Sequence, residues 1–218
     1  MKKFCLVVLF AGVVVFSGFP QSGVIREMAG DVQIKSGTSD FVPAQTGSVV
    51  SQDTIISTGF RSQALIEIGS TLITVRPLTR LSLAEIRGSQ GTESLNVNLQ
   101  AGRIRVDVTP PAGTRANVTI QSPVATASVR GTSFEMDTRN LSVGSGSVNW
   151  RDPNGFSMAV ASGYSSSISD TDKAVDPIVI AESTLTPPPP VGSGLSGEPT
   201  SSSSVASSSG YLGFNIYW

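Results

Sequence analysis

The residues that could carry chemistry in this sequence are carboxylates and arginines, because histidine is absent and the single cysteine is Cys5. Such a chain has no His-based triad, no disulfide and no Cys/His zinc site. A pair of carboxylates, as in glycoside hydrolysis, is the remaining catalytic route. The available carboxylates, which no motif gathers, are Asp53, Glu67, Glu85, Asp107, Glu135 and Asp137. No glycine-rich phosphate loop opens a helix. We therefore expect no enzyme, and no cofactor or metal.

The stretch around which the chain is organised is residues 122–138, SPVATASVRGTSFEMDT. Small residues there allow neighbouring backbones to approach closely, and a glycine tolerates a bend that other residues resist. The guanidinium of Arg130 offers five donors for carboxylates or carbonyls. The favoured interpretation is a structural corner in which Arg130 is internally paired, and the alternative is that Arg130 faces an anionic ligand. The residues of this candidate structural or binding motif are Val129, Arg130, Gly131, Thr132 and Phe134.

The elements that must position this stretch are short strands. From residue 24 to 168, apolar and polar residues alternate with period two between Gly, Ser, Asn and Pro turns, which predicts an all-β domain. Asp-Pro-Asn-Gly at 152–155 predicts a tight hairpin. Residues 81–87 are the only stretch for which we consider a short helical turn. Strands of this length fit a β-sandwich or an irregular β-solenoid of short rungs, and the pattern alone leaves both open.

The N-terminal residues 1–22 read as a secretory signal. Lys2 and Lys3 precede an apolar core over residues 4–16, which is too short to span a bilayer, and cleavage could follow Ser17 or Ser22. No second apolar run predicts a transmembrane helix, so we expect an exported protein of the periplasm or cell surface. The net charge of −1 and the scattered arginines predict no binding to nucleic acid.

The C-terminal part has a different composition. Residues 169–210 are rich in Pro, Ser and Gly, which predicts a disordered linker. Residues 211–218 then alternate apolar and polar side chains in an aromatic tail. This tail could fold back as an extra strand, or add to the sheet of a partner and associate the protein with the outer membrane. Its candidate interaction residues are Leu212, Phe214, Ile216 and Trp218.

Several segments together resemble the FecR-type domain, a periplasmic module of signalling proteins. VATASVRGTSFEM at 124–136 looks like its hallmark segment, and TGSVVSQDTIISTG at 46–59 is similar to its G-D-x-I-x-T-G segment, with Gln52 in place of a glycine. Residues 64–77 and 99–106 resemble two further rungs, with Ile68 where an aspartate is usual. The resemblance covers roughly residues 28–165.

The resemblance implies a twisted, irregular β-solenoid and a non-catalytic module of the cell envelope. It implies a protein partner and a role in protein–protein interaction, signalling or sensing outside the inner membrane. This sequence resembles a stand-alone secreted form without the anti-sigma domain. An alternative function is a structural or surface-attached envelope protein held by its aromatic tail.

Overall fold

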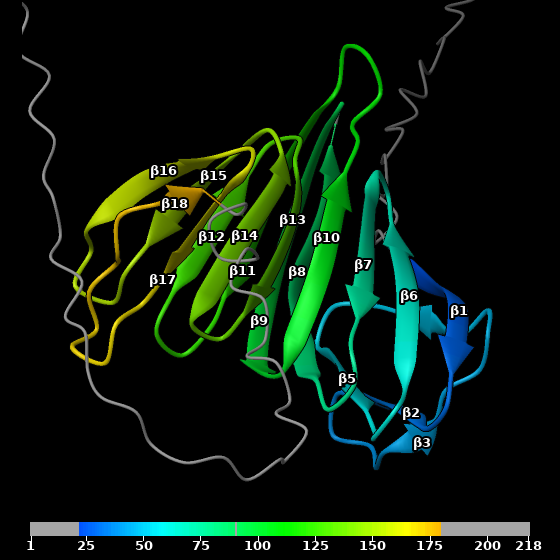
Figure 1. Ribbon diagram of the computed structural model, residues 1–218. Coiled ribbons are helices and arrows are strands. Elements are labelled where there is room, and N and C mark those ends of the chain that lie inside the picture. Colours follow the sequence, from blue (N-terminus) through cyan, green and yellow to red (C-terminus); the bar gives the residue numbers. More distant parts are fainter. Residues whose placement is uncertain (1–21, 90, 180–218) are drawn as a thin grey trace, which may run out of the picture. The chain divides into compact units, whose positions relative to one another are not determined.

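The computed structural model describes residues 22–89 and 91–179, and this part of the chain consists of strands and turns (Figure 1). The strands form two nine-stranded sheets. The spatial order in the first, sheet A, is β18 (Ile178–Val179), β17 (Tyr164–Ser167), β14 (Asn140–Ser145), β13 (Ser133–Asp137), β10 (Arg103–Val108), β7 (Thr71–Val75), β6 (Gln63–Ile68), β1 (Gly23–Ala29) and β4 (Val49–Val50). The order in the second, sheet B, is β16 (Ser157–Ala161), β15 (Ser147–Arg151), β12 (Thr126–Val129), β11 (Arg115–Gln121), β9 (Thr92–Ala101), β8 (Arg80–Ser89), β5 (Thr54–Thr58), β2 (Val32–Ser36) and β3 (Val42–Pro43).

One apolar core lies between the two sheets. In strands such as β6, β10 and β11, the alternation seen in the sequence places every second side chain inward, because successive side chains of a strand point to opposite faces. The largest fully buried side chains include Trp150 and Phe134. The all-β prediction is confirmed, and stability here comes from apolar burial and the β-ladders.

The chain passes repeatedly from one sheet to the other while advancing along both. Most neighbouring strands are close in sequence and antiparallel, and the one parallel pair among the described strands joins β9 to β11, with Arg115 opposite Thr92. The intervening β10 lies in sheet A, so β9, β10 and β11 make one turn of a solenoid. The irregular solenoid is therefore the architecture, and the two facing sheets account for its sandwich-like appearance.

Two local details bear on the sequence interpretation. Residues 81–87, considered for a helical turn, lie within strand β8. The side chains of Leu81, Leu83 and Ile86 are buried in the core. A register shift between Leu83 and Glu85 in the β8–β9 pair disturbs the period-two pattern there. The hairpin at 152–155 is confirmed: Gly155 N donates to Asp152 O at 3.1 Å between β15 and β16.

The folded part continues past the predicted linker boundary at residue 168. Ile168 forms a bridge with Ala174, whose side chain packs against the core, and β18 then pairs with β17. Asn154 Nδ2 donates to Asp172 O at 2.8 Å, which ties this segment to the β15–β16 hairpin of sheet B. Residues 169–179 thus cover the last rung, which leaves fewer core atoms exposed at this end of the solenoid.

The remaining segments lie outside the described residues. They contain the signal peptide predicted at 1–22 except its last residue, the linker predicted at 169–210 beyond residue 179, and the tail predicted at 211–218. Among the described residues, no helix is long and apolar enough to cross a membrane.

Candidate functional site

The predicted motif at 129–134 forms a corner at which the chain crosses from β12 in sheet B to β13 in sheet A. Gly131 has a φ of 154°, which side chains with a Cβ rarely adopt. Val108 N donates to Thr132 O at 2.9 Å, which joins this corner to β10. Val129 and Phe134 are buried in the core on either side. The motif is therefore mainly a structural corner.

The next crossing, at Gly146, packs directly against this corner. A Cβ on Gly146 would lie 2.6 Å from Thr132 Cγ2 and 2.8 Å from Gly131 O, and Gly146 has a φ of 77°. Only glycine fits such a close approach without displacing backbone. Successive corners of the solenoid therefore fix one another.

Arg130 is the exception within the motif, because its side chain is exposed. Among the described residues no carboxylate lies within ion-pair distance of Arg130, so the structure does not contain the expected internal pairing. The side chain lies beside the outer face of sheet B, with Asn117, Ser128 and Asn149 around the same depression. The physical reason is that the corner is held by backbone hydrogen bonds and packing, which leaves the guanidinium free.

A second corner, between β7 and β8, is held by buried threonines. Thr58 Oγ1 donates to Arg76 O at 2.6 Å and accepts from Thr79 N at 3.0 Å. Thr79 Oγ1 in turn accepts from Arg103 N and lies 3.0 Å from Arg103 O. Buried backbone groups that cannot join a ladder are satisfied in this way. Thr58, Arg76 and Arg103, which meet at this corner, each lie in a segment that resembles the FecR domain.

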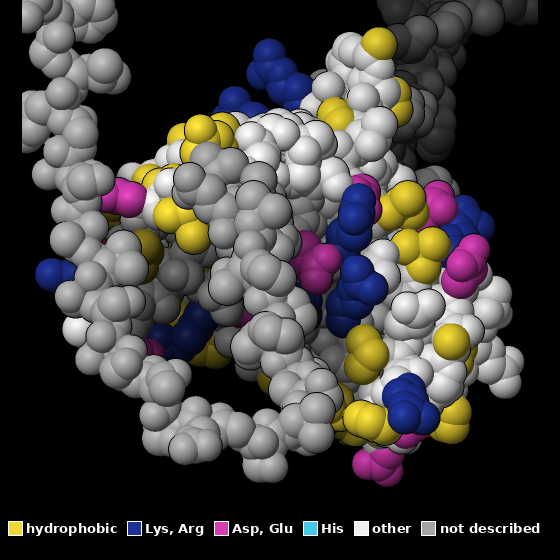
Figure 2. Space-filling view, in the orientation of Figure 1, with side chains coloured by type: hydrophobic (Ala, Val, Ile, Leu, Met, Phe, Trp, Pro, Cys, Tyr) yellow, Lys and Arg dark blue, Asp and Glu magenta, His cyan; other side chains and the backbone are white. Residues whose placement is uncertain are grey.

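The outer face of sheet A carries paired charges, visible as adjoining Lys/Arg and Asp/Glu side chains over β10 and β13 (Figure 2). Arg105 Nε lies 3.1 Å from Asp107 Oδ2, and Arg103 contacts both Glu135 and Asp137, at 3.7 and 3.4 Å. Burial alone would raise the pKa of Asp107, but hydrogen bonds from Arg105 and Ser133 outweigh it and hold the pKa below its usual range. Each of these three carboxylates is therefore bound to an arginine.

Asp137 also closes the β13–β14 hairpin. Its Oδ1 accepts from the backbone N–H groups of Arg139 and Asn140, both at 2.8 Å, and from Asn140 Nδ2 at 3.0 Å. Burial would raise the pKa of this carboxyl, but these hydrogen bonds and the nearby charge of Arg103 lower it overall. A carboxylate that accepts several backbone N–H groups stays ionised well into the acid range.

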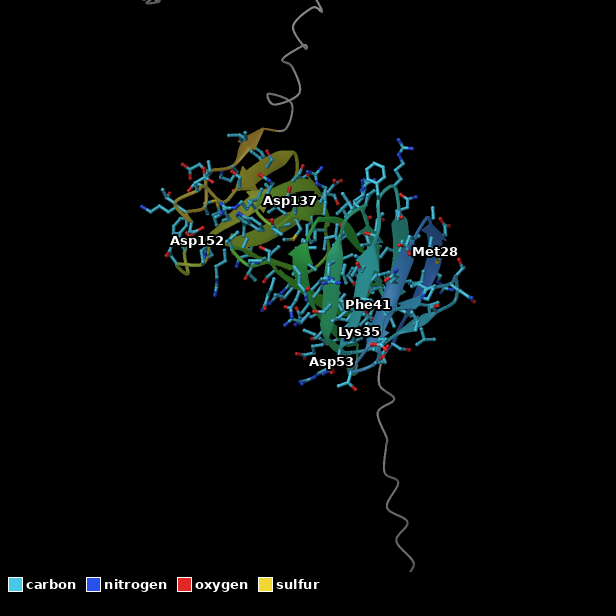
Figure 3. All side chains as sticks on the ribbon, turned by 90° about the horizontal axis from the view of Figure 1, so that it is seen from below. Met28, Lys35, Phe41, Asp53, Asp137 and Asp152 are labelled. Carbon is cyan, nitrogen blue, oxygen red and sulfur yellow. The ribbon has the colours of Figure 1, made fainter. Side chains whose placement is uncertain are left out.

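Three of the carboxylates considered for catalysis, Asp107, Glu135 and Asp137, lie on one face of the paired strands β10 and β13 and are bound there by arginines, while the other three lie elsewhere. Glu67 pairs with Arg26, Glu85 with Arg87, and Glu135 with Arg76 and Arg103. Asp53 lies at an exposed turn, and Figure 3 shows it well apart from Asp137. Within residues 22–89 and 91–179, no group of three acidic, His or Cys side chains could hold a metal ion.

A hollow lies across the outer face of sheet A. Two depressions share Arg103, Glu135, Asp137 and Asn140, so they form one continuous feature, here called the sheet A groove. Leu78 lines one end of this groove. Val175 and Ile178 line the other end.

A large exposed apolar side chain lies at each end of the sheet A groove, and charged side chains lie in its middle. The side chain of Leu78 is 63% exposed and that of Ile178 is 53% exposed, although both are large and hydrophobic. Leu78 has a φ of 56°, a strained value for a branched side chain. Exposed apolar side chains flanking a polar hollow are typical of surfaces that bind other proteins.

No signal in the sequence marks the ends of the groove, whereas its centre could have been found. Arg103, Arg105 and Asp107 alternate with apolar residues on β10, and Glu135 and Asp137 do the same on β13, so two charged strand faces were readable. Their pairing across the sheet was not readable, because register is set by the whole fold. The predicted tail residues Leu212, Phe214, Ile216 and Trp218 lie outside the described residues.

Comparison with known proteins agrees with this domain type. Residues 54–149 match the FecR protein family. Two crystal structures, at 1.65 and 2.50 Å resolution, of a candidate anti-sigma factor from Parabacteroides distasonis are similar to this chain, each with 14% identity and a TM-score of 0.47. The similar region covers 57% of this chain and 59% of theirs, so it spans less than two thirds of those proteins. No curated protein matches the chain.

The fold is thus an all-β solenoid whose crossings are built from the FecR-like segments. The match to the FecR family over residues 54–149 confirms the resemblance stated from the sequence. The matched residues run from the start of β5 to β15 and include the whole 129–134 corner.

Proposed function

We propose that this chain is a non-catalytic binding module of the cell envelope, which acts in signalling or sensing by holding a protein partner in the sheet A groove. The observation that carries the proposal is the continuity of the groove from Leu78 to Ile178 through charged residues. Apolar anchors at both ends would supply most of the binding free energy, and the charged centre would select the partner.

An extended segment of a partner fits this surface best. Strand β18 ends sheet A, and no described strand pairs with its outer edge. A partner strand could add to that edge by backbone hydrogen bonds and place alternate side chains beside Ile178 and Val175. FecR-type domains occur in signalling proteins, which supports a protein partner over a catalytic role. The signal-like N-terminus supports placing this activity outside the inner membrane.

Site-specific photo-cross-linking in cells tests the proposal. A photoreactive residue at position 78 or 178 of the full chain should capture the same protein, because both positions line one groove. Position 49 is the matched control: Val49 is 59% exposed and lies on β4, at the other end of sheet A. Capture at position 49 equal to that at 78 and 178 would contradict a partner in the groove.

A second function, surface attachment through the tail, is favoured by one observation. Leu212, Phe214, Ile216 and Trp218 alternate with other residues, as in a strand that joins another sheet. Removing residues 211–218 should release the protein from membrane fractions if the tail attaches it. Unchanged fractionation would refute attachment, and unchanged capture at position 178 would show that the groove binds without the tail.

A further inference from the structure

The outer face of sheet B differs in chemistry from that of sheet A. Its central strands β9, β11, β12 and β15 present amides and hydroxyls, in register across the sheet: Asn96 lies opposite Thr119, Thr119 opposite Ser128, and Ser128 opposite Asn149. No exposed large hydrophobic side chain among the described residues lies on these four strands. The face is therefore polar and uncharged at its centre.

These side chains are free to bind. Among the described residues, no side-chain hydrogen bond joins Asn117, Thr119, Ser128 or Asn149 to another group, whereas the polar side chains of β10 and β13 bind one another. The same face holds a depression of about 450 Å³, with the small side chain of Ala159 among its lining residues.

Arginines surround this neutral centre. Arg130 and Arg115 lie near one end of the strands, and Arg151, opposite Thr126, lies near the other. All three are exposed, and none has an ion-pair partner among the described residues. On sheet A, by contrast, Arg103 and Arg105 are bound to carboxylates. The charge left uncompensated around this part of sheet B is positive.

We propose that the outer face of sheet B binds an acidic polysaccharide. Amide and hydroxyl side chains can both donate to and accept from sugar hydroxyls, and peripheral arginines can pair with the carboxylates of uronic acid units. A protein partner fits less well, because protein interfaces centre on apolar and aromatic anchors. A single-stranded nucleic acid fits less well, because such sites stack bases on exposed aromatic side chains, and the described residues of β9, β11, β12 and β15 expose none.

Binding of alginate, a polymer of uronic acids, to the purified full chain tests this proposal. Alginate should bind with an affinity that falls as salt rises, and neutral dextran should bind far more weakly. Arg115→Gln, Arg130→Gln and Arg151→Gln should each weaken binding about fivefold, the effect of losing one exposed ion pair. Arg61→Gln, which removes an exposed arginine from the β5–β6 turn outside this face, should leave affinity unchanged.

Further probes separate sugar recognition from simple charge. Polyacrylate carries carboxylates without hydroxyls, so it should bind about tenfold more weakly than alginate at equal charge, the effect of losing one or two hydrogen bonds. Asn149→Ala should weaken alginate binding with no effect on polyacrylate. Equal binding of the two polymers, tighter binding of single-stranded DNA, or an equal loss of affinity in Arg61→Gln would each overturn the proposal. The groove of sheet A takes no part in this binding, so cross-linking from position 178 should persist in the Arg130→Gln chain.

Discussion

Replacing Thr79 and Thr132 by valine should change stability in opposite directions. Both side chains are buried and sit at corners of the solenoid. The hydroxyl of Thr79 accepts a hydrogen bond from Arg103 N, while the hydroxyl of Thr132 has no partner among the described residues. The same chemical change therefore removes a needed acceptor in one case and an unpaired polar atom in the other.

The magnitudes follow from these contacts. Thr79→Val leaves the partly buried N–H of Arg103 without its acceptor, which lowers the free energy of unfolding by about 1–3 kcal/mol. For a chain of this size, a loss of about 2 kcal/mol lowers the melting temperature by about 4–8 °C. Thr132→Val removes a buried, unpaired hydroxyl and should raise the free energy of unfolding by about 1 kcal/mol, or the melting temperature by about 2–4 °C.

Thermal unfolding of the purified full chain, followed by far-UV circular dichroism, measures both changes. Thr74→Val is the control, because Thr74 lies on the outer face of sheet A and should change the free energy by no more than about 0.5 kcal/mol. A Thr132→Val chain destabilised as much as Thr79→Val would refute the reasoning, since the Thr132 hydroxyl would then have a partner.

Three further predictions concern the corners, the ionised carboxylates and the end of the fold. Gly146→Ala should destabilise the protein by clearly more than Gly155→Ala in urea unfolding, because both have positive φ but only the first Cβ meets neighbouring atoms. Equal effects would exclude the close approach at the corner. Since the pKa of Asp137 is lowered by folding, its stabilisation is complete above the ordinary aspartate pKa of about 4 and is lost as pH falls through the lower folded value. Asp137→Asn should therefore flatten the dependence of urea midpoint on pH below about 4, and an unchanged slope would contradict this. A chain ending at residue 168 should melt at lower temperature than one ending at residue 179, and identical melting would show that residues 169–179 do not stabilise the last rung.

The strands were readable from the sequence because burial on one face imposes a period of two. Strand β10 illustrates this: Ile104, Val106 and Val108 are buried, and the residues between them face outward. The hairpin at 152–155 was readable from its turn residues alone. Local chemistry sufficed in both cases.

The site was less readable, because it depends on contacts between distant segments. Nothing near Arg130 in the sequence indicates that its corner is held by the hydrogen bond from Val108 N to Thr132 O and by the close packing of Gly146, without an ion pair. The segment at 169–179 is polar in composition, yet Ala174 packs against the core and β18 joins sheet A. This short segment buries few residues, so its polar composition does not predict that it is folded.

The two ends of the described chain lie at opposite margins of the same sheet. Gly23 begins β1, next to the marginal strand β4, and Val179 ends β18 at the far margin. With strands about 4.8 Å apart, the eight intervals of sheet A span about 38 Å. The domain can thus act as a stiff spacer. A group attached at the β4 margin and a partner bound at the β18 margin would be kept a fixed distance apart.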